Sequence, residues 1–448
     1  MAARASLLKM TPRKWRLVRT FETLLRAILP VLPPPRALEA AQVQPKSILV
    51  VEYWNLGDLA MLVPFLRSLR RRFPCAKISL LVNEGLKSFL EGQGLVDEFI
   101  AVRVPWAQHF SRWRKYNPFS RHWQSLIRVI WTLRERQFNW VISGRMDLRD
   151  NLLTWLTGAP RRIGYGVGGG GFLLTDRVPP DISRPLRADI WLHLLEVVDK
   201  PMDQGMPEFR LTSDEQAAGR AFFEASAIPE DAFVIGIHPG ARIATRRWGD
   251  ERFAEVARRL LSETDAHIVW FAEPGSMSNT PRLERCHLAS LDFRTFLAVL
   301  SRCNLLACND SGPMHLAGLL GVPVVAVFGP GKPEWYGPRG AKDRIVIRPE
   351  FWCRPCFDYC IFDEPYCLRL ITVGEVYSEI VAALEDLRAT LSEKRTSLWK
   401  IKPVDEVLST LGNRGGLVKI GSPLGCDFPA MAPSSSEQSI SRIWGKEK

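Results

Sequence analysis

The sequence lacks the features of membrane-spanning and secreted proteins. No stretch of its 448 residues approaches the uninterrupted apolar length that a membrane-spanning helix needs. No secretory signal with a small-residue cleavage site is present. The chain also lacks a Gly-x-Gly-x-x-Gly motif after its first expected strand, and Gly166 and residues 168–171 fall in an expected loop, which disfavours a dinucleotide-dependent dehydrogenase. These absences favour a cytoplasmic protein of another class.

The composition is that of a globular protein, with 46% apolar and 24% charged residues. Because the chain is too long for one hydrophobic core, we expect two domains with terminal extensions. A net charge of +12 points to an anionic partner, which could be nucleic acid, an anionic membrane or a phosphorylated ligand.

Positive charge is concentrated in residues 1–46, which hold nine Lys or Arg residues against Glu22 and Glu39. Apolar residues recur there at helical spacing: Leu17, Val18, Phe21, Leu24, Leu25 and Ile28. A basic amphipathic helix of this kind can lie in a membrane interface or pack on the protein's own surface, and the sequence leaves both readings open. A transit peptide is a weaker interpretation, because Glu22 is present and Ser is scarce.

From residue 47 onward, short apolar segments alternate with amphipathic ones, which predicts parallel sheets covered by helices. The pattern occurs twice and is interrupted by a turn-rich linker over 201–207. We therefore predict an α/β protein with two doubly wound, Rossmann-like domains facing each other across a cleft. The predicted segments are an N-terminal extension over 1–46, domains over 47–200 and 208–392, and a largely disordered C-terminal extension over 393–448.

The most informative segment runs from Asn309 to Gly329, where an expected strand meets a helix that leads into another strand. Asp310 or Ser311 suits the N-cap, and Pro313 suits the first helical turn. The amides of Gly312, Met314 and His315 would then form a phosphate site, beside which Asp310 and His315 can hold sugar hydroxyls. The alternative is an ordinary strand–helix turn.

A second anion-binding segment follows the first strand of the second domain. Residues 238–242 read His-Pro-Gly-Ala-Arg and residues 245–248 read Thr-Arg-Arg-Trp. The amides around Gly240, the Thr245 hydroxyl and the Arg246 guanidinium can bind phosphate at the same sheet edge as Asp310. The alternative is a solvated basic loop.

Asp58 follows the first strand of the first domain within Trp-Asn-Leu-Gly-Asp. A carboxylate at the carboxyl end of that strand faces the expected cleft and can accept a proton from an attacking hydroxyl. It can equally cap the helix that follows.

Four cysteines form a cluster whose spacing suits a four-thiolate zinc or iron–sulfur site, although it also permits redox disulfides: Cys353, Cys356, Cys360 and Cys367. We expect a structural role for it, with or without metal. An aromatic and basic stretch from Trp106 to Trp140 can bind nucleic acid, line a lipid or sugar site, or simply pack two helices. Since no nucleic-acid motif accompanies it, nucleic acid is the weakest of these readings.

Taken together, these segments resemble glycosyltransferase family 9, the lipopolysaccharide heptosyltransferases and their relatives. The resemblance spans about residues 47–390 and is strongest over 309–330. Its other elements are the Gly-Asp at 57–58, the Gly-Ala-Pro-Arg-Arg-Ile-Gly-Tyr at 158–165, the segments 238–241 and 246–248, and the cysteine cluster with the residues that follow it.

The resemblance implies a GT-B fold and metal-independent, inverting transfer of a sugar, typically heptose from ADP-heptose, to a lipid-linked saccharide. It implies that Asp58 is the general base and that Arg246 stabilises the leaving diphosphate. The donor would contact Gly240, Thr245, Asp310, Ser311, Gly312, Met314 and His315. It also implies an acceptor-side first domain, a donor-binding second domain, and a peripheral location at the inner face of the bacterial inner membrane.

Three departures from the family pattern concern detail. Position 246 is Arg where these enzymes usually have Lys, the residues before Gly57 are bulky, and the segment 273–291 is short. Another nucleotide sugar or a protein or capsule acceptor therefore remains an alternative. A catalytically silent glycan- or membrane-binding scaffold, and a metal-dependent regulatory protein, are alternatives from other classes.

Overall fold

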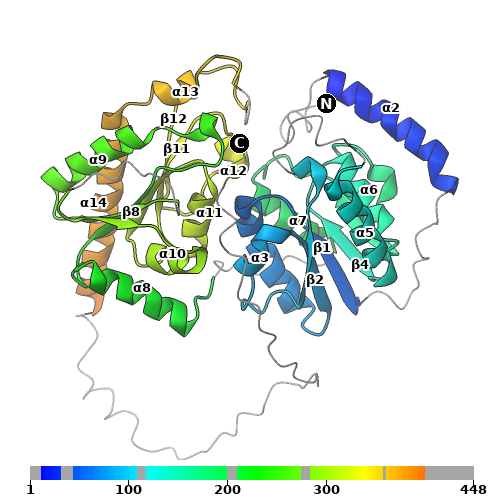
Figure 1. Ribbon diagram of the computed structural model, residues 1–448, viewed down its shortest axis with the longest axis horizontal. Helices are drawn as coiled ribbons and strands as arrows, with labels where there is room; N and C mark the ends of the chain where they lie inside the picture. The colour runs from blue at the N-terminus through cyan, green and yellow to red at the C-terminus, as the bar shows by residue number, and fades with distance from the viewer. Residues whose placement is uncertain are drawn as a thin grey trace, which may run out of the picture.

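The computed structural model describes residues 12–31, 44–107, 117, 119–198, 209–273, 283–356 and 360–398. It contains two six-stranded parallel sheets, one for each predicted domain (Figure 1). The predicted linker over 201–207 and residues 399–448 of the predicted C-terminal extension lie outside the described residues. No helix within the described ranges is long and apolar enough to cross a membrane.

The first sheet has the strand order β3-β2-β1-β4-β5-β6. Its strands are β1 (Ser47–Val51), β2 (Lys77–Asn83), β3 (Glu98–Val102), β4 (Trp140–Ser143), β5 (Arg161–Tyr165) and β6 (Asp176–Val178). The main helices are α3 (Leu56–Arg72), α5 (Arg121–Glu135), α6 (Leu148–Leu156) and α7 (Arg187–Val198), with the short turns η3 (Glu84–Phe89), η4 (Pro105–Ala107) and η5 (Gly171–Leu173) between them. α3 and α7 pack together, and α5 contacts α6 and β3.

The second sheet has the order β12-β11-β10-β7-β8-β9, which is the same topology. Its strands are β7 (Val234–His238), β8 (His267–Phe271), β9 (Cys286–Ala289), β10 (Leu305–Asn309), β11 (Val324–Phe328) and β12 (Arg344–Ile347). Its helices are α8 (Ser213–Ala225), α9 (Asp250–Glu263), α10 (Phe293–Leu300), α11 (Gly312–Leu319), α12 (Pro333–Tyr336), α13 (Tyr366–Arg369) and α14 (Val373–Leu398), with η6 (Ala244–Arg246) after β7. α14 runs past the boundary predicted at residue 392.

In both sheets the strand order reverses beside the first strand, between β1 and β4 and between β7 and β10. Ligands of doubly wound sheets bind at this switch point, outside the carboxyl ends of the strands. β10 and β11 are buried along their whole length, as expected of central parallel strands covered on both faces. The α/β class and the doubly wound sheets predicted from the sequence are therefore confirmed.

Four strands were not predicted from the sequence, and each lies at the edge of its sheet or next to it. β5 begins with two arginines and holds Gly164, so it is not an apolar run, and β6 is only three residues long. β9 lies in the segment that appeared too short, but residues 274–282 lie outside the described ranges. β12 was missed as well, since it too is an edge strand.

The two domains meet along the carboxyl edges of their sheets. α3 of the first domain packs on α11 of the second. Beside this contact, Arg339 forms an ion pair with Asp189 at 2.6 Å, and Arg187 lies over the rings of Trp335 and Tyr336. The loops that follow β1 and β10 are thereby brought together at the domain interface.

α2 (Pro12–Ile28) and the turn η1 (Leu29–Val31) precede the first sheet. Figure 1 shows α2 at the outer side of the first domain, away from the second domain. α2 confirms the helix expected from the apolar spacing of the N-terminal extension.

Candidate active site

Asp58 lies in the first turn of α3, where it takes part in capping that helix, and its role as general base stays a prediction. Its Oδ2 accepts a hydrogen bond of 3.2 Å from the amide of Asn55, which is the N-cap of α3, so Asp58 completes a capping box. Its other oxygen, Oδ1, lies 2.7 Å from a guanidinium nitrogen of Arg145. Capping therefore fixes the orientation of the carboxylate at the domain interface.

Arg145 was not anticipated from the sequence, and it joins two carboxylates. Its Nη2 lies 2.7 Å from Asp58 and 2.9 Å from Glu52, and its guanidinium lies over the ring of Trp54 at 5.0 Å. Burial raises the pKa of Glu52, and the Asp58 carboxylate adds to this effect. Burial alone would raise the pKa of Asp58 too, but Arg145 holds it below its ordinary value.

This arrangement follows from the topology. Glu52 comes directly after β1 and Arg145 comes shortly after β4, so both leave the sheet at its switch point. The signal that could have identified Arg145 is a charged residue directly after the short apolar strand at 140–143. The corresponding signal for its partner Glu52, which is 2% exposed, is a charged residue at the end of an expected apolar strand.

In the second domain, Asn309 connects the two predicted anion-binding segments. This fully buried side chain accepts a hydrogen bond of 3.0 Å from the amide of Trp248 and donates one of 2.6 Å to the carbonyl of Pro239. One residue further on, Asp310 leaves β10 only 3% exposed. The two segments are thus brought to one edge of the sheet, as predicted.

Arg246 and Asp310 form an ion pair at this edge of the sheet, with 3.5 Å between Nη1 of Arg246 and Oδ2 of Asp310. Gly331 packs against the same carboxylate, since a Cβ atom built at position 331 would lie 2.0 Å from Oδ2 of Asp310. Only glycine fits there without displacing the carboxylate. Gly331 is a second residue that sequence reasoning missed.

The start of α11 agrees only in part with the prediction. Ser311 is the N-cap residue, and its hydroxyl donates a hydrogen bond of 3.2 Å to the carbonyl of Asn309. The amide of Met314 donates to the carbonyl of Ser311 at 3.2 Å, and the Met314 side chain is fully buried. Met314 is therefore a core residue whose amide has a partner within the first turn, and a contact between this amide and a donor phosphate stays a prediction.

The remaining predicted donor contacts lie around this turn. Gly312 begins α11 and faces Leu56 of the first domain. Thr245 is half-buried in η6, directly before Arg246, and Gly240 is half-buried beside His238 and follows β7.

His315 connects the two halves of the site. A Cβ atom at Gly57 would lie 2.8 Å from Cδ2 of His315, so the two domains touch at this point. Burial lowers the pKa of His315 to about 4, and both Asp58 and Arg246 act on its charge through space. The imidazole is therefore neutral at pH 7 and lies between the carboxylate of one domain and the guanidinium of the other.

An apolar pocket opens beside this turn. It is lined by residues of both domains: Leu56, His238, Phe271, Phe293, Phe296 and Pro313. Burial lowers the pKa of His238 to about 4, so its ring is also neutral at pH 7. The pocket lies at the carboxyl ends of β7 and β8, where doubly wound domains bind a nucleotide.

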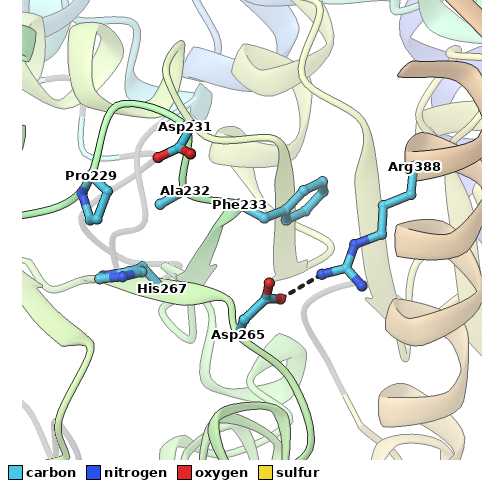
Figure 2. A pocket seen from close by; sticks show the side chains of 7 residues that line it. All are labelled: Pro229, Asp231, Ala232, Phe233, Asp265, His267 and Arg388. Atoms are coloured by element: carbon cyan, nitrogen blue, oxygen red, sulfur yellow. Dashed lines mark hydrogen bonds and ion pairs between the residues drawn. The ribbon is translucent and has the colours of Figure 1, made fainter. Parts of the chain in front are cut away.

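A different pocket lies at the opposite edge of the second sheet, as Figure 2 shows. Its residues precede or begin β7 and β8, and Arg388 of α14 closes it through an ion pair of 2.6 Å with Asp265. Because it lies at the amino ends of the strands, it is separated by the sheet from Asp310 and Arg246. It holds none of the predicted site residues.

The aromatic and basic stretch predicted between Trp106 and Trp140 falls partly outside the described residues, which exclude 108–116. Within the described part, Trp106 packs on Trp123 and donates a hydrogen bond of 3.0 Å to the hydroxyl of Tyr53. Tyr53 in turn donates to Asp150. These contacts belong to the packing of α5 and η4 on the first sheet, which is the structural reading of that stretch.

The cysteine cluster lies in the loop after β12, with Cys367 buried and the other three half-buried and reduced. No group of three or more His, Cys, Asp or Glu side chains in the described part of the chain is arranged to hold a metal ion. Burial raises the pKa of Cys367 to about 11, and the nearby thiols of Cys356, Cys353 and Cys360 add to this effect, so the four thiols lie close to one another. A metal bound by these thiols stays a prediction.

The loop instead supports the donor side. Arg354 donates hydrogen bonds of 2.9 Å to the carbonyl of Gly331 and 2.7 Å to that of Arg348, and the amide of Cys356 donates to the carbonyl of Pro330 at 3.2 Å. Gly331 is the residue that packs on Asp310. The cysteine loop is thereby joined to the donor-side carboxylate.

Known proteins share this fold, and about a quarter of the aligned residues of their sequences are identical to this one. Residues 126–366 match the family model of glycosyltransferase family 9 (heptosyltransferase). Lipopolysaccharide heptosyltransferase 2 of Escherichia coli K12 is 25% identical over 321 residues, which cover 67% of this chain and 87% of the relative. Lipopolysaccharide heptosyltransferase 1 of Pseudomonas aeruginosa is 23% identical over 375 residues, covering 75% and 98%.

Solved structures agree. A family 9 glycosyltransferase from Veillonella parvula superposes with a TM-score of 0.62 at 24% identity, covering 76% of this chain and 98% of that one. The ADP-heptose heptosyltransferase II of E. coli gives 0.55 at 21% identity, covering 76% and 99%. These likenesses confirm the GT-B fold, and the family match covers more than half of the chain. The chain belongs to glycosyltransferase family 9 (heptosyltransferase).

Proposed function

We propose that this chain transfers a heptosyl residue from ADP-heptose to a lipid-linked saccharide, in the synthesis of lipopolysaccharide or a related cell-surface glycan. One observation carries the assignment of roles. The carboxylate of Asp58 from the first domain and the Arg246–Asp310 pair from the second face a common point, marked by His315 between them. This arrangement supports a transfer site in which each domain serves one of the two substrates.

In the proposed step, Asp58 removes the proton from an acceptor hydroxyl as its oxygen attacks the anomeric carbon of the donor. The bond between that carbon and the phosphate oxygen breaks, and ADP leaves with the electron pair. A single displacement inverts the anomeric centre. Arg145 keeps Asp58 ionised and ready to accept the proton, although the same contact makes the carboxylate a weaker base.

The leaving diphosphate gains negative charge, which the second domain is suited to receive. The Arg246 guanidinium, the Thr245 hydroxyl, the amides near Gly240 and Gly312 and the positive end of α11 would bind it. We propose metal-independent transfer because a fixed guanidinium and a helix N-terminus supply this charge stabilisation.

The donor's sugar and base have separate contacts in this proposal. Asp310, held in place by Gly331, and the neutral His315 would bind sugar hydroxyls beside Ser311. The apolar pocket beside His238 is the proposed place for the nucleobase, and its aromatic side chains would have to move apart to admit the base, because the cavity as it stands measures only about 20 Å³. An E. coli heptosyltransferase of the same fold, with a TM-score of 0.53 at 16% identity, was solved with ADP-2-deoxy-2-fluoro heptose, which supports an ADP-sugar as the first donor to test.

We also propose a peripheral location at the inner face of the bacterial inner membrane, where a lipid-linked acceptor would be reached. The cysteine cluster has a structural role in this account, since its loop supports Gly331 and Asp310 through Arg354. A zinc or iron–sulfur group is not needed for that role. Metal analysis of the purified protein tests whether one is present.

Calorimetric titration of the purified chain with a panel of nucleotide sugars, including ADP-heptose, tests the donor assignment. Asp310→Asn, which keeps the size of the side chain, is the matched control. The proposal predicts that ADP-heptose binds the wild type and binds the variant at least about tenfold more weakly. Binding of another nucleotide sugar in preference to ADP-heptose would assign a different donor, and no binding across the panel would favour a catalytically silent scaffold.

A further inference from the structure

The apolar residues of α2 divide between two faces of the helix. Val18 and Leu25 face the first domain and join a cluster that contains Leu148, Trp155 and Leu173. Leu25 is only 7% exposed. α2 is therefore packed on α6 and the glycine-rich turn before η5, as one of the two sequence-based readings expected.

Polar contacts fix α2 in this position. Glu22 accepts a hydrogen bond of 2.6 Å from the amide of Gly170, and Arg26 lies 3.9 Å from the ring centre of Phe172. Gly169 lies against Val18, because a Cβ atom there would be 2.7 Å from that side chain. Glu22, the single acidic residue of α2, is thus used for packing on the domain.

The face of α2 next to this packed face carries a row of exposed apolar side chains. Leu17, Phe21, Leu24 and Ile28 follow one another at spacings of four, three and four residues, and each is about half exposed or more. The exposed cations Arg13 and Lys14 lie on either side of the row, and Arg16 is exposed further around the helix. An apolar row of this kind, bordered by positive charge, is typical of a helix that lies in the interface of an anionic membrane.

A second exposed apolar pair lies nearby on the same domain. Ile127 and Trp131, one helical turn apart on α5, are 51% and 62% exposed, and Arg128 beside them is exposed as well. α5 contacts α6, and α6 also carries α2. The exposed row of α2 and the exposed pair of α5 therefore lie on two helices that both pack on α6.

We propose that the outward face of α2, assisted by Ile127 and Trp131, is a docking surface for an anionic lipid bilayer. The occupant follows from chemistry: the exposed cations Arg13 and Lys14 beside the row, and Arg128 beside the second pair, complement anionic headgroups, and the Leu, Ile, Phe and Trp side chains enter the interface. The cations would repel a second copy of the same basic face. The inference deepens the proposed function, on which its biological role rests, because the docked helix belongs to the domain that holds Asp58.

Vesicle co-sedimentation of the full chain tests this surface without donor or acceptor. The variant Leu17→Gln, Phe21→Gln, Leu24→Gln alters only the outward row. The matched control carries three exposed apolar residues of the second domain changed in the same way, Leu288→Gln, Ile361→Gln and Leu370→Gln. Two kinds of vesicle are compared: anionic vesicles of phosphatidylglycerol with phosphatidylethanolamine, and uncharged vesicles of phosphatidylcholine alone.

We expect the wild type and the control to bind the phosphatidylglycerol vesicles, and the α2 variant to partition at least about tenfold less. Binding should weaken in phosphatidylcholine and at high salt. Equal partition of the α2 variant and the wild type would overturn the proposal. So would a wild type that binds no vesicle and instead forms a dimer that the variant abolishes, because the row would then be a contact between copies.

Calorimetric binding of ADP-heptose to the same variants separates the two proposals. An α2 variant that binds donor normally but leaves the vesicles supports the docking surface and leaves the transferase assignment intact. A wild type that binds vesicles but no nucleotide sugar would contradict the proposed function alone.

Discussion

Gly57 and His315, one from each domain, approach so closely that a Cβ atom at position 57 would lie 2.8 Å from Cδ2 of the imidazole. Gly57 directly precedes Asp58, and His315 lies in the first turn of α11. This contact therefore sets how far the proposed base lies from the proposed donor phosphates. Since transfer depends strongly on that spacing, both residues become targets for mutation.

Gly57→Ala should lower kcat/KM on the order of a hundredfold, because the added methyl group forces His315 and α11 away from Asp58. Steady-state transfer kinetics measure this effect. The control is Gly318→Ala in α11, the helix that holds His315, because an added Cβ atom there meets no atom within 4 Å. That control should keep its activity and gain about 0.5–1 kcal/mol of stability. Equal activity of both variants would show that the contact does not set the geometry.

Asp58→Asn should lower kcat by about a hundredfold to ten-thousandfold while donor binding persists, because the amide cannot accept the acceptor's proton. Single-turnover kinetics and calorimetry on the same protein separate the two effects. Turnover comparable with that of the wild type would remove Asp58 from the role of base.

Arg145→Gln should shift the acidic limb of the kcat–pH profile to higher pH. Arg145 holds the pKa of Asp58 below its ordinary value, so its loss raises the pH at which the carboxylate becomes ionised. Arg145→Lys should restore part of the shift, since it keeps the charge but not the two-carboxylate geometry. An unchanged profile in both variants would show that Arg145 acts on stability alone.

Gly331→Ala should weaken donor binding at least about tenfold, since the methyl group would take the position of Oδ2 of Asp310. Gly374→Ala, whose nearest surrounding atom is 4.0 Å away, is the control and should bind donor as the wild type does. Calorimetry decides between the two. Unchanged affinity in Gly331→Ala would separate Asp310 from the donor.

Stability should fall as the pH drops from about 6.5 toward about 4. The pKa of His238 is about 4 in the folded chain and near 6.5 when it is exposed, so only the unfolded chain binds a proton between these values. At about pH 5 the loss should reach up to about 2 kcal/mol for His238. Denaturant unfolding of the wild type and His238→Gln measures it, and an identical pH dependence in both would contradict the prediction.

Much of this site could be predicted because its residues lie in the loop or first helical turn that follows an apolar strand. Asp58 and Asp310 stand after β1 and β10, and parallel strands bring their carboxyl ends to one edge. Asn309 then joins the 238–248 segment to the same edge, a contact between residues far apart in the sequence. The sequence predicted that these residues lie at one edge of the sheet, but the hydrogen bonds of Asn309 that join the two segments are seen only in the structure.

The residues that were missed depend on tertiary packing. Arg145 and Glu52 acquire their importance only because β1 and β4 are neighbours, and Gly331 only because its loop folds over Asp310. The apolar spacing of α2 also could not show which of its apolar residues are buried and which are exposed. Packing on Gly169 and Gly170 decides which of them turn toward the domain. The hydrogen bond from the Met314 amide to the carbonyl of Ser311 likewise could not be read from the sequence, because it depends on the geometry of the first turn.

The most direct test of this account is transfer from ADP-heptose to a lipid-linked saccharide extract by the purified full chain, in the presence of a metal chelator. Mass spectrometry of the product, with determination of its anomeric configuration, gives the readout. The account predicts a heptosylated product with inverted configuration, formed by the wild type and nearly absent with Asp58→Asn. A retained configuration, or equal product from the Asp58→Asn variant, would contradict it.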